Sequence, residues 1–176
     1  MAGHSKWAQI KRKKAVTDAA KSREFGKFAK LIAAESKRAG GDINSPGLRA
    51  VIERARAANM PKDNIDRAVK KGTEAGGATM ESVIFETYGP GGVALIIEGL
   101  TDNNNRTAPE IRHLLSKHGC ELAAPGSASW AFTKSTEGYE PTTTVELTDE
   151  DTEKLSALVD ALDEHEDVQN VYTTAA

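Results

Sequence analysis

The sequence has a single cysteine, Cys120, among its 176 residues, so an intrachain disulfide framework is excluded. Cysteine and histidine nowhere occur together at the spacing of a zinc finger. No apolar stretch approaches the roughly 18 residues of a membrane span, and the first residues contain no apolar signal region. These absences favour a soluble protein in a reducing, cytoplasmic setting.

Basic residues are scarce after residue 72, and acidic residues are scarce before it. Met1 to Gly72 holds 18 Lys and Arg residues against 7 Asp and Glu, a net charge of +11, whereas Thr73 to Ala176 holds 5 against 19, a net charge of −14. A basic module of this size indicates a polyanionic partner, because Lys and Arg displace the counterions condensed on phosphates. Solvated helix faces without a partner are the alternative. The break in charge predicts a basic domain at 1–72, a linker at 73–80 and an acidic domain at 81–176.

The basic part has the apolar spacing of three helices. Apolar side chains recur at three- and four-residue steps over about 15–39, 46–59 and 61–72. Ser45-Pro46 places a capping residue before a proline at the start of the second helix, and Gly72 is expected to terminate the third. We expect a three-helix bundle with its cations outside.

Four consecutive cations precede the first expected helix. Side chains at four adjacent positions do not share one helix face, so the run suits an extended arm along a phosphate backbone, and a solubilising tail is the alternative. Trp7 beside it either stacks on a base or a sugar or plugs the core under the bundle. The candidate nucleic-acid contacts of this segment are Lys6, Trp7, Lys11, Arg12, Lys13 and Lys14.

The periodicity changes after the linker. Two strand-like runs at 82–88 and 93–98 flank Gly89-Pro90-Gly91-Gly92 and predict a hairpin, not a phosphate loop, because no helix follows the glycines. Helices are expected from Thr107, which has capping-box spacing to Glu110, and after Thr148. Short strands are expected at about 120–122, 128–132, 142–147 and 168–173. The pattern predicts a two-layer α+β domain with a mainly antiparallel sheet.

The acidic part contains no catalytic constellation. Asp149, Glu150 and Asp151 fall in the first turn of a helix, where the macrodipole favours carboxylates without any catalytic role. His113 and His118 are five residues apart, a spacing that does not place two metal ligands on one helix face. We therefore expect a protein that is not an enzyme, with no cofactor, no metal and no small-molecule substrate.

One polar run, Asp102-Asn103-Asn104-Asn105-Arg106, lies between a strand and a helix. Asn and Asp favour such turns for structural reasons, and a binding role is the alternative. Asn105 and Arg106 are therefore included among the candidate nucleic-acid contacts.

These motifs resemble the YebC/PmpR family, which includes the mitochondrial translational activator of cytochrome c oxidase. The resemblance rests on the opening residues 1–7, the turn at 88–92, the run 102–107 and the closing residues 167–172, in the same order along nearly the whole chain. It implies a helical N-terminal domain followed by α+β domains. The bacterial members are mostly described as DNA-binding transcriptional regulators, and the mitochondrial relatives resemble translation factors that act on the ribosome.

The chain departs from the family pattern in one place. Members usually carry an extra α+β domain between the strands that match 129–132 and 142–147, whereas here only Thr133 to Pro141 connects them. The chain therefore resembles a short form without the inserted domain.

The sequence predicts a non-enzymatic nucleic-acid-binding regulator of gene expression, with DNA as the leading target. Two alternatives stay open. One is a translation factor bound to ribosomal RNA, and the other is an interaction scaffold whose basic bundle docks an acidic protein or the acidic half of another copy. No helix rich in Asn, Gln or Arg base readers follows a helix-turn-helix pattern, which favours binding to ribosomal RNA or to the backbone over sequence-specific DNA recognition.

Overall fold

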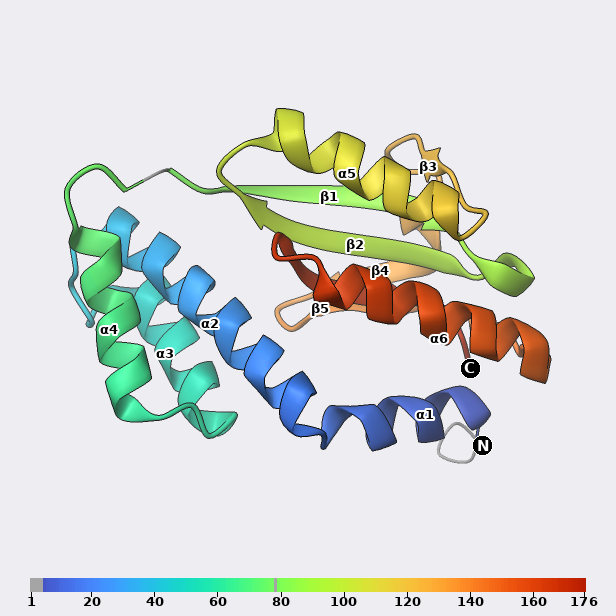
Figure 1. Cartoon of the computed structure of the whole chain (residues 1–176), viewed down its shortest axis with the longest axis horizontal. Helices are drawn as coiled ribbons and strands as arrows, with labels where there is room; N and C mark the ends of the chain where they lie inside the picture. The colour runs from blue at the N-terminus through green and yellow to red at the C-terminus, as the bar shows by residue number, and fades with distance from the viewer. Residues whose placement is uncertain (1–4, 78) are drawn as a thin grey trace. The chain divides into compact units, whose positions relative to one another are not determined.

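The computed structural model describes residues 5–77 and 79–176, and the chain divides into two compact units (Figure 1). One unit, here called the helical unit, is Thr17–Met80. The other, the α+β unit, combines Met1–Val16 with Glu81–Ala176. Residues 1–4 of the opening motif and residue 78 of the expected linker lie outside the described part of the chain.

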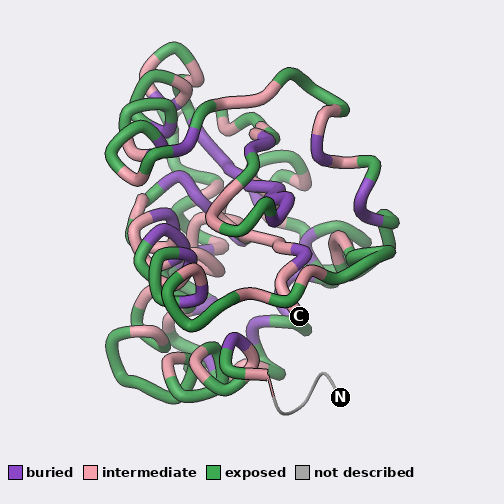
Figure 2. The backbone as a smooth tube through the Cα atoms, turned by 90° about the vertical axis from the view of Figure 1, so that its right-hand side faces the viewer, coloured by how far each residue is buried: buried purple, intermediate pink, exposed green. Residues whose placement is uncertain are grey.

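Three helices, α2 (Asp18–Ala39), α3 (Pro46–Ala57) and α4 (Lys62–Thr73), form the helical unit, as the apolar spacing predicted. Thr17 caps α2 by accepting a hydrogen bond from the Ala20 N–H, and Gly40 ends it in the left-handed conformation. Buried and exposed positions alternate along the helices (Figure 2), because each helix turns one apolar stripe inward. The shared core consists of Ile32, Leu48, Val51, Ile52, Ala55, Met60, Ile65 and Ala68.

Gly72 lies within α4 and does not terminate it as predicted, since the helix continues to Thr73. A Cβ atom at this position would overlap the Ala33 carbonyl oxygen and come within 2.7 Å of the Ser36 Cβ. Beside it, the fully buried Ser36 hydroxyl donates to the Val69 carbonyl at 2.6 Å. Glycine is needed here because α2 and α4 approach closely, a requirement that depends on the fold and not on the local sequence.

A four-stranded antiparallel sheet in the order β3-β1-β2-β6 forms the centre of the α+β unit. Strands β1 (Glu81–Tyr88) and β2 (Ala94–Thr101) make the predicted hairpin, joined through the short 3-10 turn η2 (Pro90–Gly92). Strand β6 (Val168–Thr173) pairs with β2, and β3 (Leu122–Ala123) pairs with β1. The predicted α+β class is confirmed.

Helices α5 (Asn104–Lys117) and α6 (Asp149–Glu164) cover one face of this sheet (Figure 1). Side chains at alternate positions of β2, Leu95 and Ile97, point to this face and pack against both helices. Helix α5 begins three residues before the expected Thr107, because Asn103 caps it through a hydrogen bond from the Asn105 N–H. No helix in the described ranges is long and apolar enough to cross a membrane.

The other face of the sheet is covered by the segment after β3. The turn η3 (Ser129–Ala131) and the hairpin β4 (Phe132–Ser135) with β5 (Gly138–Pro141) lie over Ala94 and Ile96 of β2. The predicted strand at 142–147 is wrong: only Val145 forms an isolated bridge, with Ala175. Three successive threonines have high strand propensity, but no neighbouring strand is available along their whole length.

Helix α1 (Lys6–Ala15) belongs to the α+β unit, not to the basic bundle in which the sequence placed it. Ser5 caps it by accepting a hydrogen bond from the Ala8 N–H at 3.1 Å. The expected extended arm at 11–14 is therefore wrong, because these residues form the last turns of a helix that runs alongside α6 (Figure 1).

Glu86 is a buried carboxylate that organises the loop before η3. Its oxygens accept hydrogen bonds from the backbone N–H groups of Gly126, Ala128 and Ser129 at 2.6, 3.0 and 2.6 Å. Burial by itself would raise the pKa of Glu86, but these three donors stabilise the charged form, and the pKa is lowered from its ordinary value of 4.5.

Replacing Trp7 tests the placement of α1. Its indole is 7% exposed and packs in the core beside Leu155 and Leu158. We expect Trp7→Ala to reduce the free energy of unfolding by about 3–5 kcal/mol, because it leaves a cavity. Thermal and urea unfolding measure this, and Lys13→Ala on the exposed side of the same helix is the control. An unchanged melting temperature with loss of single-strand binding would instead assign the ring to base stacking.

The Glu86 carboxylate makes stability depend on pH. Because its folded pKa is lowered, its contribution is present above the unfolded value of 4.5 and is lost as the pH falls through the folded value. We expect Glu86→Gln to cost about 2 kcal/mol at pH 7. Urea unfolding at a series of pH values from 7 downward measures the free energy of unfolding of both proteins. We expect the difference between the variant and the parent protein to shrink as the pH falls. A difference independent of pH would contradict this assignment.

Candidate nucleic-acid interface

Two of the predicted contact cations, Lys6 and Lys14, face carboxylates of α6. The Lys6 Nζ lies 3.6 Å from Asp149 and 3.7 Å from Glu153. The Lys14 Nζ donates to the Ser156 hydroxyl at 2.6 Å and forms an ion pair with Asp160. The acidic helix thus occupies the places that phosphates would take on these two side chains.

Trp7 offers no face for a base. The sequence left stacking and core burial open for this ring, and the structure places it in the core of the α+β unit, not under the helical bundle. The Lys11 Nζ lies 5.7 Å from the centre of the Trp7 ring, a cation–π contact between two residues of α1.

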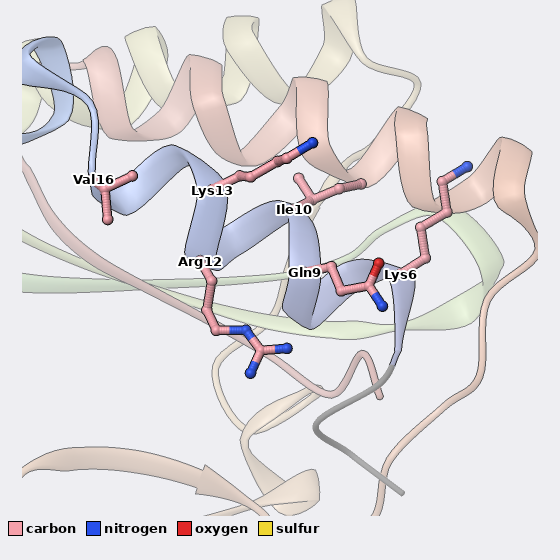
Figure 3. Close-up of a pocket in the computed structure, with 6 residues that line it drawn as sticks. All are labelled: Lys6, Gln9, Ile10, Arg12, Lys13 and Val16. Carbon is pink, nitrogen blue, oxygen red and sulfur yellow. The ribbon is translucent and has the colours of Figure 1, made fainter.

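Part of the α1 surface remains exposed and cationic. Arg12 and Lys13 are exposed there, and they line a shallow depression together with aliphatic side chains (Figure 3). Val16 at its end is 70% exposed. The residues that line the depression are Lys6, Gln9, Ile10, Arg12, Lys13 and Val16. Of the predicted cations, Arg12 and Lys13 are thus the ones best placed for a phosphate.

The helical unit carries a second group of cations that the residue-level prediction did not include. Its 13 Lys and Arg residues exceed its 8 Asp and Glu residues. Three of the cations are neutralised locally, since Arg38, Arg49 and Lys62 pair with carboxylates on their own helices. The Asp66 hydrogen bond raises the pKa of Lys62 accordingly.

Among the exposed cations of the helical unit that have no such partner are four on the neighbouring helices α3 and α4. Within 5–77 and 79–176, no carboxylate lies at ion-pair distance from them. They are Arg54 and Arg56 on α3 and Lys70 and Lys71 on α4. We name these four side chains the bundle cations. Arg54 also lies over the Phe28 ring at 5.7 Å, which limits its freedom.

Why these side chains point outward follows from the helix period. The buried positions of α3 are Leu48, Val51, Ile52 and Ala55, and those of α4 are Ile65 and Ala68. Positions between them on the 3.6-residue period necessarily face solvent. The charge count of the sequence indicated a basic surface here, but only the ion pairs of the structure separate neutralised cations from available ones.

The other predicted contacts, Asn105 and Arg106, lie at the start of α5. Asn105 is exposed, and its backbone N–H completes the cap. Arg106 is held by carboxylates on every side: its guanidinium lies 2.8 Å from Asp167, 2.9 Å from Glu110, 3.6 Å from Asp102 and 3.8 Å from Glu166. The hydrogen bond to Asp167 is the main reason that its pKa is raised. A guanidinium so neutralised has little attraction left for a phosphate, so this position no longer supports a nucleic-acid contact.

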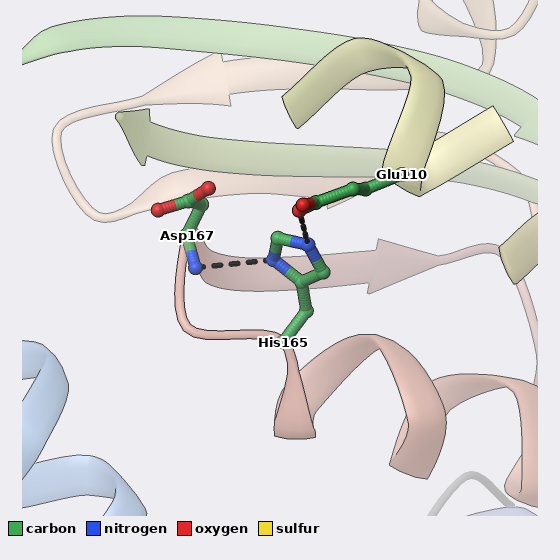
Figure 4. A group of neighbouring side chains, drawn as sticks. All are labelled: Glu110, His165 and Asp167. Carbon is green, nitrogen blue, oxygen red and sulfur yellow. Dashed lines mark hydrogen bonds and ion pairs between the residues drawn. The ribbon is translucent and has the colours of Figure 1, made fainter. Parts of the chain in front are cut away.

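The same network brings Glu110, His165 and Asp167 together, each with a potential metal-ligand atom within 4.8 Å of the others (Figure 4). The His165 Nδ1 accepts from the Asp167 backbone N–H at 3.1 Å, so in the neutral ring Nε2 carries the proton and donates to Glu110 at 2.8 Å. A cation would have to displace this proton and compete with the Arg106 guanidinium. The geometry is that of a salt-bridge network joining α5 to the turn before β6.

Arg106→Ala tests this structural assignment. Asp167 is 2% exposed, and its carboxylate accepts from the Arg106 guanidinium and from the Thr107 hydroxyl, each at 2.8 Å. We expect the free energy of unfolding to fall, because the buried Asp167 carboxylate loses a charge-assisted hydrogen bond. Affinity for duplex DNA should stay unchanged in an anisotropy titration. The control is Arg112→Ala, an exposed cation on the same helix. Normal stability together with weakened DNA binding would return Arg106 to the interface.

Comparisons with known proteins agree with this architecture. A protein of Thermoanaerobacter pseudethanolicus named probable transcriptional regulatory protein is 41% identical over 235 aligned positions, which cover 98% of this chain and 96% of the relative. A Thermosipho africanus protein of the same description is 56% identical over 134 residues, 75% of this chain and 53% of its own length. The crystal structure of a conserved hypothetical protein from Aquifex aeolicus superposes with a TM-score of 0.75 at 30% identity, covering 90% of this chain and 91% of that one.

Family models account for almost the whole sequence. The model of the TACO1/YebC protein N-terminal domain matches residues 5–75. The model of the TACO1/YebC second and third domain matches residues 80–137 and 133–175. The two segments meet at 133–137, inside the β4–β5 hairpin, where the sequence resemblance indicated that a domain is missing. The chain therefore belongs to the TACO1/YebC family.

Proposed function

We propose that the protein is a DNA-binding transcriptional regulator that contacts the phosphate backbone chiefly through the bundle cations. The observation that carries this proposal is the set of four exposed Lys and Arg side chains, on two adjacent helices, without carboxylate partners in the described residues. A cation without a carboxylate partner in its own protein is available to neutralise a phosphate. Each neutralised phosphate releases counterions that were condensed on the nucleic acid, and this release supplies most of the affinity.

The names of the relatives support the same direction. Both the Thermoanaerobacter and the Thermosipho proteins are named probable transcriptional regulatory proteins. Such a regulator needs nucleic-acid affinity but no active site. The lone thiol, Cys120, is buried, and burial raises its pKa, so it is a poor nucleophile.

In this proposal, α1 contributes less to phosphate binding than the bundle cations do. Arg12 and Lys13 are exposed, and Lys6 and Lys14 face carboxylates of α6. The α+β unit, with 18 Asp and Glu residues in 81–176 against 5 Lys and Arg, repels phosphate outside the surface of α1. The helical unit therefore has the more favourable electrostatic surface for a polyanion.

The test measures the salt dependence of binding by the full chain to labelled duplex DNA. Each phosphate contact contributes about 0.9 to the slope of log affinity against log salt, so changing the four bundle cations to Gln should flatten the slope by roughly 2–4 units. The matched control changes Arg38, Arg49 and Lys62 to Gln, because these cations already have carboxylate partners. This control should flatten the slope much less.

A third variant, with Lys11, Arg12, Lys13 and Lys14 changed to Gln, compares α1 with the helical unit. We expect a change of about one or two units, since Lys14 is paired and Lys11 lies over Trp7. A larger effect from this variant than from the bundle variant would overturn the proposed location. Tighter retention by structured RNA than by duplex DNA at equal salt would overturn the choice of DNA.

A further inference from the structure

Trp130 is an exposed indole on the acidic unit. The chain has two tryptophans, and whereas Trp7 is buried, Trp130 in η3 is 67% exposed. Tyr88 beside it, at the end of β1, is 40% exposed. An aromatic ring left in water forgoes the burial that usually stabilises it, so its position calls for a reason.

Hydrogen bonds hold the exposed ring in place. The Trp130 Nε1–H donates to the Tyr88 hydroxyl at 2.9 Å, and this hydroxyl donates to the Ser127 carbonyl at 2.5 Å. The indole thus satisfies its only polar atom inside the protein. What it presents to solvent is an apolar ring surface that needs no water partner.

The backbone on both sides of Trp130 is also fixed. The Ser129 N–H is bound to Glu86, and the Ala131 N–H donates to the Ala128 carbonyl at 3.1 Å. Ala131 is buried against Ile96, so η3 has little freedom to turn the indole inward. An aromatic ring that is ordered before binding loses little conformational entropy when a partner covers it, which is a property of interface hot spots.

Charge determines what kind of partner fits. The segment 121–147, of which Ala128, Ala131, Phe132 and Tyr139 pack on this face of the sheet, has one lysine, Lys134, and its ammonium lies 5.8 Å from the Tyr139 ring. The same segment has four exposed glutamates: Glu121, Glu137, Glu140 and Glu146. A nucleic acid would be repelled from this surface, whereas a cationic side chain would be attracted to it.

We propose that Trp130 and Tyr88 form a docking surface for an arginine-bearing segment of a partner protein, with a guanidinium stacked on the indole and the exposed glutamates of the segment 121–147 attracting its charge. Arginine suits this surface better than lysine because its planar guanidinium stacks on an aromatic ring and gives up its hydration more readily. The proposed surface is independent of the bundle cations. It gives the protein a protein-binding function in addition to nucleic-acid binding.

The experiment follows the indole N–H signals of the ¹⁵N-labelled full chain by NMR during titration with peptides. The probe is a capped peptide of alternating arginine and glycine, compared with the same peptide containing lysine or neutral citrulline in place of arginine. The Trp130 signal is assigned by its loss in Trp130→Ala, and the buried Trp7 provides an internal reference. We expect the arginine peptide to shift the Trp130 signal, the lysine peptide to bind more weakly and the citrulline peptide to leave it unmoved.

Variants then separate a specific site from general adhesion. Trp130→Ala should weaken binding of the arginine peptide about tenfold, and Tyr88→Phe, which frees the indole N–H, by a smaller factor. Ile84→Ala removes another exposed apolar side chain of the same sheet and should change nothing. Equal binding by Trp130→Ala, equal binding of citrulline, or a larger shift with single-stranded DNA would each overturn the proposal. No shift with any probe would show an indole that is merely left uncovered, and would overturn it as well.

Discussion

Burial of the Trp7 indole determines how charge is distributed over the molecule. Because the ring packs beside Leu155 and Leu158, α1 and its five cations become part of the acidic unit. Apolar burial supplies the main free energy for this placement, and the exposed ion pairs of Lys6 and Lys14 with α6 add little to it. The net positive charge of the helical unit is therefore smaller than that of the first 72 residues. In the proposed function, its bundle cations make the main contact with phosphates.

The two tryptophans illustrate opposite uses of the same side chain. Trp7 contributes to the stability of the α+β unit, and its partners are apolar side chains from α6 and the sheet. Trp130 contributes little to the core. Its orientation is fixed because its indole N–H donates to the Tyr88 hydroxyl and the N–H of the preceding Ser129 donates to Glu86. Glu86 therefore has two effects: its hydrogen bonds hold the loop before η3 in place, and by holding Ser129 they also position the neighbouring Trp130 ring.

Much of the fold was predictable because it depends on local signals. The apolar spacing and the capping residues Ser45-Pro46 and Thr148 gave the helices of both units, and the glycine turn at 89–92 gave the β1–β2 hairpin. The contacts that define the candidate site were not local. The carboxylate that neutralises Arg106 is Asp167, 61 residues away, and the partner of Lys14 is Asp160, 146 residues away. No spacing rule predicts such pairs, so the sequence identified the basic surface but not which of its cations are available.

The β4–β5 hairpin shows how a family can gain or lose a domain without redesigning its sheet. Neighbouring antiparallel strands place their connected ends about 5 Å apart, so a folded domain with adjacent termini can replace the turn at 136–137 and leave the pairing of Phe132 with Pro141 intact. The entropy of closing a loop grows only slowly with its length, so such an exchange costs the parent fold little. The hairpin is thus a modular junction, at which the two matched segments of the second family model overlap.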